Sequence, residues 1–149
     1  AAQRGMKVCM NVAPFDPSVL TLPLELVDLL VVNEIEGAGL AGMQETQDFK
    51  AILERLVTRF PNSQILLTIG KQGCWYAFKD LRIHHDIYDT EVVDTTAAGD
   101  TFIGYYLASI ARGHSIRQAL QYASKAAGLA VSRPGAMASI PLADEVFYY

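Results

Sequence analysis

Residues 92–102 have the sequence VVDTTAAGDTF, which passes from β-branched residues to small residues and then into a helical pattern. Small residues at such a junction let the backbone approach a ligand closely. The first N–H groups of the helix lack an internal acceptor and lie at the positive end of the helix dipole, so they suit an anion. Asp100, in the first helical turn, is placed to accept a proton while those N–H groups hold a transferring group.

A simpler interpretation of the same stretch gives it no chemistry. Asp94 and Asp100 would cap the helix and complement its dipole, and Gly99 would serve packing alone. The spacing by itself does not decide between these two interpretations.

The segments around this stretch alternate between strand and helix patterns. Strands are predicted at Lys7–Val12, Asp28–Asn33, Gln64–Gly70, Cys74–Phe78 and Leu81–Ile87, the last two as a hairpin. Helices are predicted at Leu20–Val27, at Gln44–Phe60, from Ala98 to about Arg112, from the break and cap at Gly113-His114-Ser115 to about Ser132, and from Leu142. This order predicts an α/β fold, and because no linker or repeat interrupts it we expect residues 1–149 to form a single domain.

Composition limits the classes of partner. The 149-residue chain is 51% hydrophobic and carries a formal net charge of −4, which argues against nucleic-acid binding because that work needs clustered Lys and Arg. Its apolar runs are far too short to span a bilayer. Two cysteines without C-x-x-C spacing indicate neither a zinc site nor a disulfide framework. We therefore expect a cytoplasmic protein without a membrane or nucleic-acid partner.

The stretch from Asp94 to Asp100 matches the signature D-T-x-[AG]-[AG]-G-D, and the chain thereby resembles the ribokinase-like (PfkB) carbohydrate kinases. The resemblance implies the C-terminal portion of the three-layer, Rossmann-like ribokinase fold, an α/β fold with helices on both faces of the sheet. It implies Asp100 as the catalytic base, with Ala97, Ala98 and Gly99 forming the anion hole.

Further segments resemble the same family in the same order. Residues 11–14, NVAP, resemble its N-P-A-P strand end, and residues 33–36, NEIE, match its N-x-x-E motif. Residues 68–73, TIGKQG, resemble its T-x-G-x-x-G turn at the nucleotide site. The cofactor-binding residues implied are Asn33 and Glu36 for Mg²⁺ and phosphate, Thr68, Gly70 and Gly73 at the nucleotide, and Ser124, where relatives often place Asn or His near adenine. Taken alone, Glu36 would be a solvated residue at a helix start and Gly70 part of a tight loop.

Residues 130–141, AVSRPGAMASIP, resemble the segment that closes the monovalent-cation site of ribokinases. The resemblance implies a K⁺-like ion held by Asp94, Thr96, Ala130, Arg133, Gly135 and Ser139. The alternative is an ordinary helix C-cap at Gly135 followed by a proline-bounded loop.

The resemblance implies ATP-dependent phosphorylation of a sugar hydroxyl, most closely of ribose to ribose 5-phosphate, with Mg²⁺ and K⁺ as cofactors. Two alternatives stay open. One is a nucleotide-binding or interaction module without turnover, and the other is a kinase of a related nucleoside or phosphosugar.

Only the later part of the family pattern is found in the chain, because the G-G-x-x-x-N sugar motif and the β lid are not in it. We expect a fragment of a longer kinase, which the absence of an initiator Met favours, or a natural half-length protein. Lacking the sugar side, the chain alone is expected to be poorly active. An exposed sheet edge and apolar face predict self-association or a complementary N-terminal half.

Overall fold

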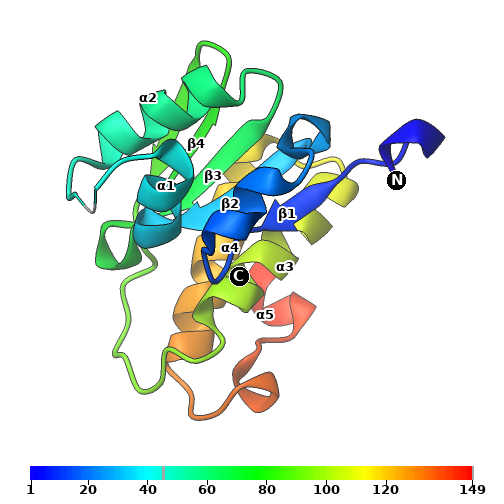
Figure 1. Ribbon diagram of the computed structural model, residues 1–149. Helices are drawn as coiled ribbons and strands as arrows, with labels where there is room; N and C mark the ends of the chain where they lie inside the picture. Colours follow the sequence, from blue (N-terminus) through cyan, green and yellow to red (C-terminus); the bar gives the residue numbers. More distant parts are fainter. Residues whose placement is uncertain (45, 149) are drawn as a thin grey trace. The chain divides into compact units, whose positions relative to one another are not determined.

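The computed structural model describes residues 1–44 and 46–148 (Figure 1). The chain divides into two compact units, Ala1–His84 and His85–Tyr149. Each unit is described by itself, and the expectation of a single domain stays a prediction.

The first unit is built on a five-stranded sheet with the order β1-β2-β3-β4-β5 (Figure 1). Strands β1, β2 and β3 are parallel, and β4 is antiparallel to β3. The strands span Cys9–Asn11, Leu29–Asn33, Gln64–Thr68, Cys74–Phe78 and Leu81–His85. All five predicted strands are therefore present, four of them shorter than expected.

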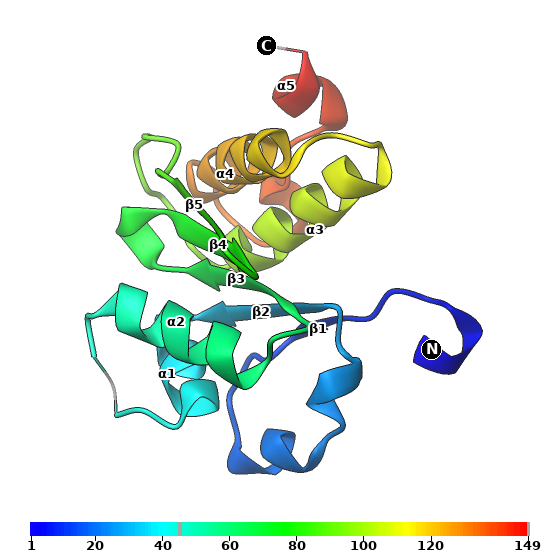
Figure 2. The same cartoon turned by 90° about the horizontal axis from the view of Figure 1, so that it is seen from above.

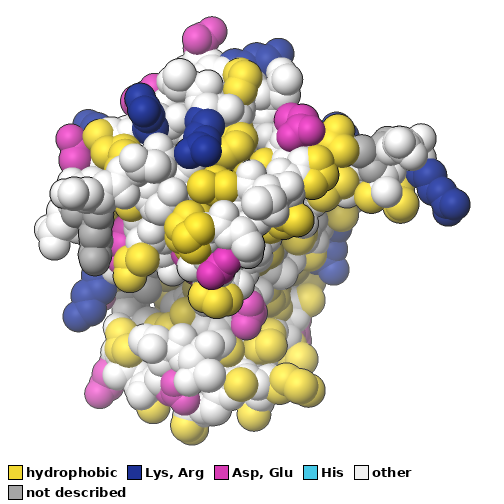
Figure 3. Space-filling view, in the orientation of Figure 1, with side chains coloured by type: hydrophobic (Ala, Val, Ile, Leu, Met, Phe, Trp, Pro, Cys, Tyr) yellow, Lys and Arg dark blue, Asp and Glu magenta, His cyan; other side chains and the backbone are white. Residues whose placement is uncertain are grey.

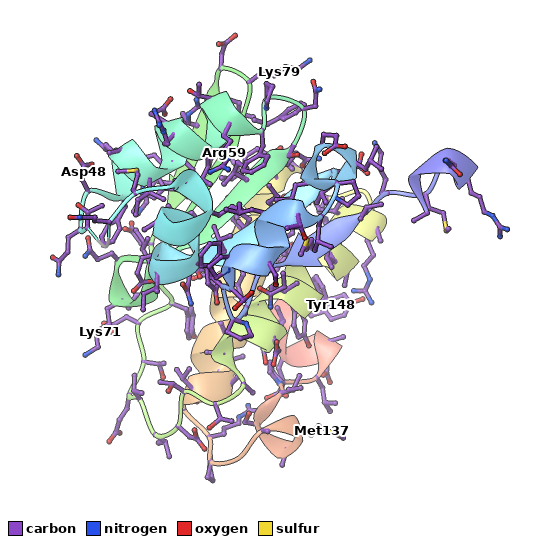
Figure 4. All side chains as sticks on the ribbon, viewed as in Figure 1. Asp48, Arg59, Lys71, Lys79, Met137 and Tyr148 are labelled. Carbon is purple, nitrogen blue, oxygen red and sulfur yellow. The ribbon has the colours of Figure 1, made fainter. Side chains whose placement is uncertain are left out.

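Helices α1 (Glu34–Ala41) and α2 (Phe49–Arg59) lie together on one face of this sheet (Figure 2). Alternate residues of β2 and β3 face these helices, because successive side chains of a strand point to opposite faces of the sheet. The core of the unit is formed mainly by Leu30, Val32, Ile65, Leu67, Ile52, Leu53 and Leu56. Figure 4 labels Asp48, whose side chain caps α2, and Arg59 at the other end of that helix.

Two predicted helices of this unit differ from the structure. The helix expected over Leu20–Val27 is replaced by two 3-10 turns, η2 (Pro17–Thr21) and η3 (Leu24–Leu26), because Pro23 interrupts the segment. The helix expected over Gln44–Phe60 begins only at Phe49, and residue 45 lies outside the described residues. The separate helix α1 was not predicted. Two further 3-10 turns are η1 (Ala2–Arg4) and η4 (Gly70–Gln72).

The second unit consists of α3 (Ala98–Ala111), α4 (Ile116–Val131), the 3-10 turn η5 (Met137–Ser139) and α5 (Ala143–Phe147). All three α-helices were predicted, although Tyr149 lies outside the described residues. Ser115 caps α4 through a capping box with Gln118. The ring of Phe147 packs against Tyr122 and His114, which fixes α5 on the rest of the unit.

On the face drawn in Figure 3, Lys and Arg side chains are dispersed among acidic and hydrophobic ones and do not form one continuous basic stripe. Across residues 1–44 and 46–148, no helix combines the length and the apolar character needed to cross a bilayer.

Candidate functional site

In the first unit, predicted site residues meet at the carboxyl ends of two parallel strands. Asn33 ends β2, Thr68 ends β3, and the two residues are register partners. Ligands of open α/β sheets bind at this edge, where the strands deliver their last residues to the loops. The sheet register therefore brings together two of the residues predicted from separate motifs.

Asn33 and Glu36 form a capping box at the start of α1. The Asn33 side-chain oxygen accepts hydrogen bonds from the N–H groups of Ile35 (3.0 Å) and Glu36 (2.9 Å). The Glu36 carboxylate accepts one from the Asn33 N–H (2.8 Å) and is only 6% exposed. The N-x-x-E motif thus has a definite role in ending β2 and starting α1, and its role toward Mg²⁺ stays a prediction.

The turn after β3 depends on its two glycines. Gly70 has φ +53° and Gly73 has φ +85° with ψ −133°, conformations that disfavour a side chain. The Ile69 N–H donates to the Gly73 carbonyl at 2.9 Å, which closes the turn. Apart from Gly70 itself and its two chain neighbours, no atom of the described residues lies within 4 Å of the place where a Gly70 Cβ would stand, so the backbone is approachable there.

In the second unit, α3 begins without a side-chain cap. Its N-cap residue is Ala97, whose side chain has no oxygen to accept a hydrogen bond from the N–H groups of the first helical turn. Helices α1, α2 and α4 all begin on a residue whose side chain does accept one. Asp100 lies exposed in the first turn of α3. An uncapped helix start beside an exposed carboxylate is suited to an anion that is attacked by a hydroxyl group.

Asp94 does not cap α3, contrary to the simpler interpretation. One of its carboxylate oxygens accepts from the N–H and hydroxyl of Thr96, and the other accepts from the Gly135 N–H at 3.0 Å. The Thr96 hydroxyl, with these two N–H groups, holds the pKa of Asp94 below its ordinary value. Asp94 therefore joins the turn before α3 to the segment that follows α4.

The residues implied for a monovalent cation lie mostly along these two joined segments. Gly135, with φ +90°, lies beyond the end of α4, and the C-cap of that helix is Ser132, so the interpretation of Gly135 as the C-cap is wrong. The Arg133 N–H donates to the Ala130 carbonyl (3.1 Å), and the buried Ser139 donates to the Ala136 carbonyl (2.7 Å).

The types of oxygen implied for this site suit a monovalent cation, and the bound ion itself stays a prediction. One carboxylate, several backbone carbonyls and a hydroxyl are hard oxygen ligands carrying little net charge. Within the described part of the chain, no group of three or more His, Cys, Asp or Glu side chains is arranged to hold a metal ion. A Mg²⁺ ion that keeps its waters and binds through phosphates needs no such cluster.

A cavity of about 640 Å³ opens in the second unit between the segment His85–Tyr88 and helix α4. Ser124 lies on its wall and donates a hydrogen bond to the Asp86 carbonyl at 2.9 Å. Gly128 lets this segment lie close to α4, because a Cβ there would stand 2.7 Å from the Tyr88 ring. The structure thus places Ser124 at a cavity, with its hydroxyl engaged by the backbone.

One residue of this region was not predicted. Glu145, at the start of α5, lines the cavity and accepts hydrogen bonds from the Arg133 guanidinium. Arg133 and the Leu142 N–H hold the pKa of Glu145 below its ordinary value. The available signal was Glu145 three residues after Leu142, the spacing of a capping box, but Leu142 is not one of the usual cap residues.

The chain matches the model of the pfkB family of carbohydrate kinases over residues 1–143. Among curated proteins it is 36% identical to the ribokinase of Staphylococcus aureus (strain COL) over 149 residues, covering 98% of this chain and 48% of that protein. It is 33% identical to the ribokinase of Schizosaccharomyces pombe, of which it covers 47%. The chain therefore spans about half the length of the curated relatives it matches.

Solved structures show the same fold. The ribokinase of Arabidopsis thaliana, complexed with ribose and ATP, matches with a TM-score of 0.86 and 30% identity, over 99% of this chain and 48% of that one. The ribokinase of Cryptococcus neoformans in complex with ADP matches with a TM-score of 0.85 and 25% identity, over 97% and 51%. The predicted three-layer, Rossmann-like α/β fold is thereby confirmed. This chain belongs to the pfkB family of carbohydrate kinases.

Proposed function

We propose that the protein transfers the γ-phosphoryl group of ATP to a hydroxyl group of a sugar, with ribose as the favoured acceptor. The observation that carries this proposal is the start of α3, where an alanine N-cap leaves the helix uncapped and Asp100 stands exposed in the first turn. Phosphoryl transfer is mostly positioning and charge stabilisation, and these two features serve both.

In this proposal Asp100 accepts the proton of the attacking sugar hydroxyl. The sugar oxygen then bonds to the γ-phosphorus, the bond to the β-phosphate oxygen breaks, and ADP leaves. The backbone N–H groups at Ala97, Ala98 and Gly99 form the anion hole for the phosphoryl oxygens. Charge that develops on those oxygens is met by the positive end of α3.

Asp94 serves this centre through the backbone. Its contacts with Thr96 and Gly135 fix the turn that leads into Ala97. A bound K⁺ would supply positive charge beside that turn, held by Asp94, Thr96, Ala130, Arg133, Gly135 and Ser139. Mg²⁺ would neutralise the charge of the phosphates, and Asn33 and Glu36 are the residues proposed to help arrange it.

The cavity beside Ser124 is our candidate for the adenine site. It is larger than one nucleobase, and its lining includes the apolar side chains of Ile87, Tyr88 and Leu129, which suit a flat ring. Because the Ser124 hydroxyl is engaged by the Asp86 carbonyl, we assign Ser124 to shaping the cavity and not to base recognition. Thr68, Gly70 and Gly73 line the turn assigned to the rest of the nucleotide.

Ribose is proposed because several relatives of this chain are ribokinases, and because the similar ribokinase of Arabidopsis thaliana was solved with ribose and ATP. The chain spans about half of these relatives, so the sugar-binding part is proposed to come from a complementary N-terminal half or from self-association. The edge strand β1 is the place where such a partner would extend the sheet. A monomer in analytical ultracentrifugation would contradict this partner proposal. We further propose that the protein works in the cytoplasm.

The second candidate function is a nucleotide-binding module without turnover. It is favoured by one observation, that the matched half carries the motifs of the ATP side. The experiment incubates the protein with γ-³²P-labelled ATP and with ribose, fructose, a nucleoside or a phosphosugar in turn. Label in ribose supports the main proposal. Label in another acceptor keeps the proposed phosphoryl transfer and makes that compound the acceptor. ATP binding without label in any acceptor favours the module.

A further inference from the structure

The Glu145 carboxylate ties together the two ends of the segment Arg133–Leu142, which we call the cation loop. Helix α4 ends at Val131 and α5 begins at Ala143, so this segment is the whole connection between them apart from Ser132. At one end, the Arg133 guanidinium donates to both carboxylate oxygens of Glu145. At the other end, the Leu142 N–H donates to the same carboxylate at 2.7 Å.

Glu145 itself is held firmly in place. The next residue, Val146, is completely buried, and its carbonyl accepts a hydrogen bond from Lys125 of α4 at 3.3 Å. Phe147 then packs against the rings of His114 and Tyr122, which also contact each other. A carboxylate anchored in this way can fix the ends of a loop in which Ser139 and Pro141 are buried and most other residues are exposed.

Beyond Glu145, the cation loop is held near its C-terminal end, where the Tyr105 hydroxyl of α3 donates a hydrogen bond to the Pro141 carbonyl at 2.6 Å. Its tip is exposed, with Met137 87% accessible and directed to solvent (Figure 4). The buried Ser139 hydroxyl bonds within the loop, to the Ala136 carbonyl, and only Gly135 reaches the turn before α3, through its bond to Asp94. The position of Gly135 relative to Asp94 therefore depends on where the two ends of the loop are fixed.

We propose that Glu145 is a positioning residue for monovalent-cation binding, acting through Arg133 and Leu142 on the cation loop. The inference rests on the proposed function, because that function supplies the cation. Glu145 contributes by geometry, since it sets where the loop carbonyls lie. It also contributes by charge, since it neutralises Arg133, whose guanidinium would otherwise oppose a cation at the neighbouring carbonyls.

The test measures equilibrium binding of ⁸⁶Rb⁺, a K⁺ substitute, to the full protein without ATP or sugar. Glu145→Gln is expected to weaken binding by about 10-fold to 100-fold, the range typical of groups that orient ligand-bearing segments. Asp144→Asn, the same change of charge one residue earlier on α5, is expected to leave binding unchanged. In a phosphorylation assay, raising K⁺ should restore activity to Glu145→Gln, which a purely structural defect would not allow.

A second variant separates the effect of loop geometry from the effect of the Arg133 charge. It also keeps the proposal testable if Glu145→Gln fails to fold. Arg133→Gln keeps the bond between Glu145 and the Leu142 N–H, removes the positive charge, and should still weaken Rb⁺ binding because one end of the loop is released. Because Glu145 and Arg133 act as a unit, the variant that carries both substitutions should bind Rb⁺ no more weakly than the single variant with the lower affinity. Wild-type Rb⁺ affinity in folded Glu145→Gln or Arg133→Gln contradicts the proposal. Absence of Rb⁺ binding by the wild type also contradicts it, and leaves phosphoryl transfer to be judged by its own assay.

Discussion

The Asp94 carboxylate accepts a hydrogen bond from the backbone N–H of Gly135, 3.0 Å away and 41 residues later in the chain. The same carboxylate accepts from Thr96, at the turn that leads into α3. One side chain thus links the candidate anion hole to the cation loop. A substitution that moves the cation loop is therefore expected to shift the turn before α3, and the reverse is also expected.

The ionised form of Asp94 should stabilise this link, with a defined pH dependence. Its pKa is lowered in the folded chain, so its contribution is complete above the ordinary aspartate pKa of about 3.9 and is lost as the pH falls through the lowered value. An NMR titration of the carboxylate carbon should give a midpoint below that value. Thr96→Val, which removes the hydroxyl donor, should move the midpoint upward. A wild-type midpoint at or above the ordinary value would contradict the assigned hydrogen bonds.

Two variants of Glu36 separate helix capping from Mg²⁺ chemistry. Glu36→Gln keeps an oxygen acceptor at the capping-box position, so the free energy of unfolding should change little. Glu36→Ala removes the acceptor and should cost about 0.5–2 kcal/mol in urea unfolding, the usual cost of a lost cap. If Glu36 also helps to place Mg²⁺, Glu36→Gln should raise the Mg²⁺ concentration needed for half-maximal activity. An unchanged Mg²⁺ requirement would leave capping as its role.

Gly128→Ala should disturb the cavity beside Ser124. The new Cβ would stand 2.7 Å from the Tyr88 ring and 3.0 Å from the Tyr88 carbonyl oxygen, so the segment over α4 has to move. We expect a loss of about 1–3 kcal/mol in stability from overpacking, together with weaker ATP binding by calorimetry.

Gly104→Ala is the matched control for Gly128→Ala. It lies inside α3 with no atom within 4 Å of the added Cβ, and it should stabilise the helix by up to about 1 kcal/mol. If Gly128→Ala and Gly104→Ala change the ATP affinity equally, the cavity beside Ser124 is not the nucleotide-binding site.

The fold was predictable where one chemical pattern decides one element. β4 was predicted with its observed ends, because an apolar run is followed directly by the Lys79-Asp80 turn. Helix α1 was not predicted, since Gly37 and Gly39 weaken any helical pattern. The structure explains them: a Cβ on Gly39 would stand 2.6 Å from the Phe15 ring, and one on Gly37 would stand 3.1 Å from Ile52. Such close approaches arise from tertiary packing, and a local sequence pattern carries no information about which distant side chains a residue will contact.

The candidate site shows the same division. The helix start at Ala98, with Asp100 in its first turn, was predictable from the local pattern, whereas the chemical role of the motif rests on the family resemblance and stays a prediction. The resemblance implied Asp94 and Gly135 at one cation site, but neither the hydrogen bond between them nor the pair of Arg133 and Glu145 was predicted. Both depend on the path of the cation loop, and that path is set by contacts between residues far apart in the sequence.

The central claim is that Asp100 is the base of a phosphoryl transfer organised at the start of α3, and one substitution tests it most directly. Asp100→Asn keeps the shape of the side chain and removes its ability to take a proton. In the full-length context, with the sugar-binding half present, sugar-dependent ADP formation should then fall by about 10²-fold to 10⁴-fold in kcat, while the Kd for ATP stays unchanged. Asp80→Asn, in the exposed hairpin turn, serves as the control and should retain full activity. Wild-type kcat in Asp100→Asn would contradict the account and remove Asp100 from the role of base.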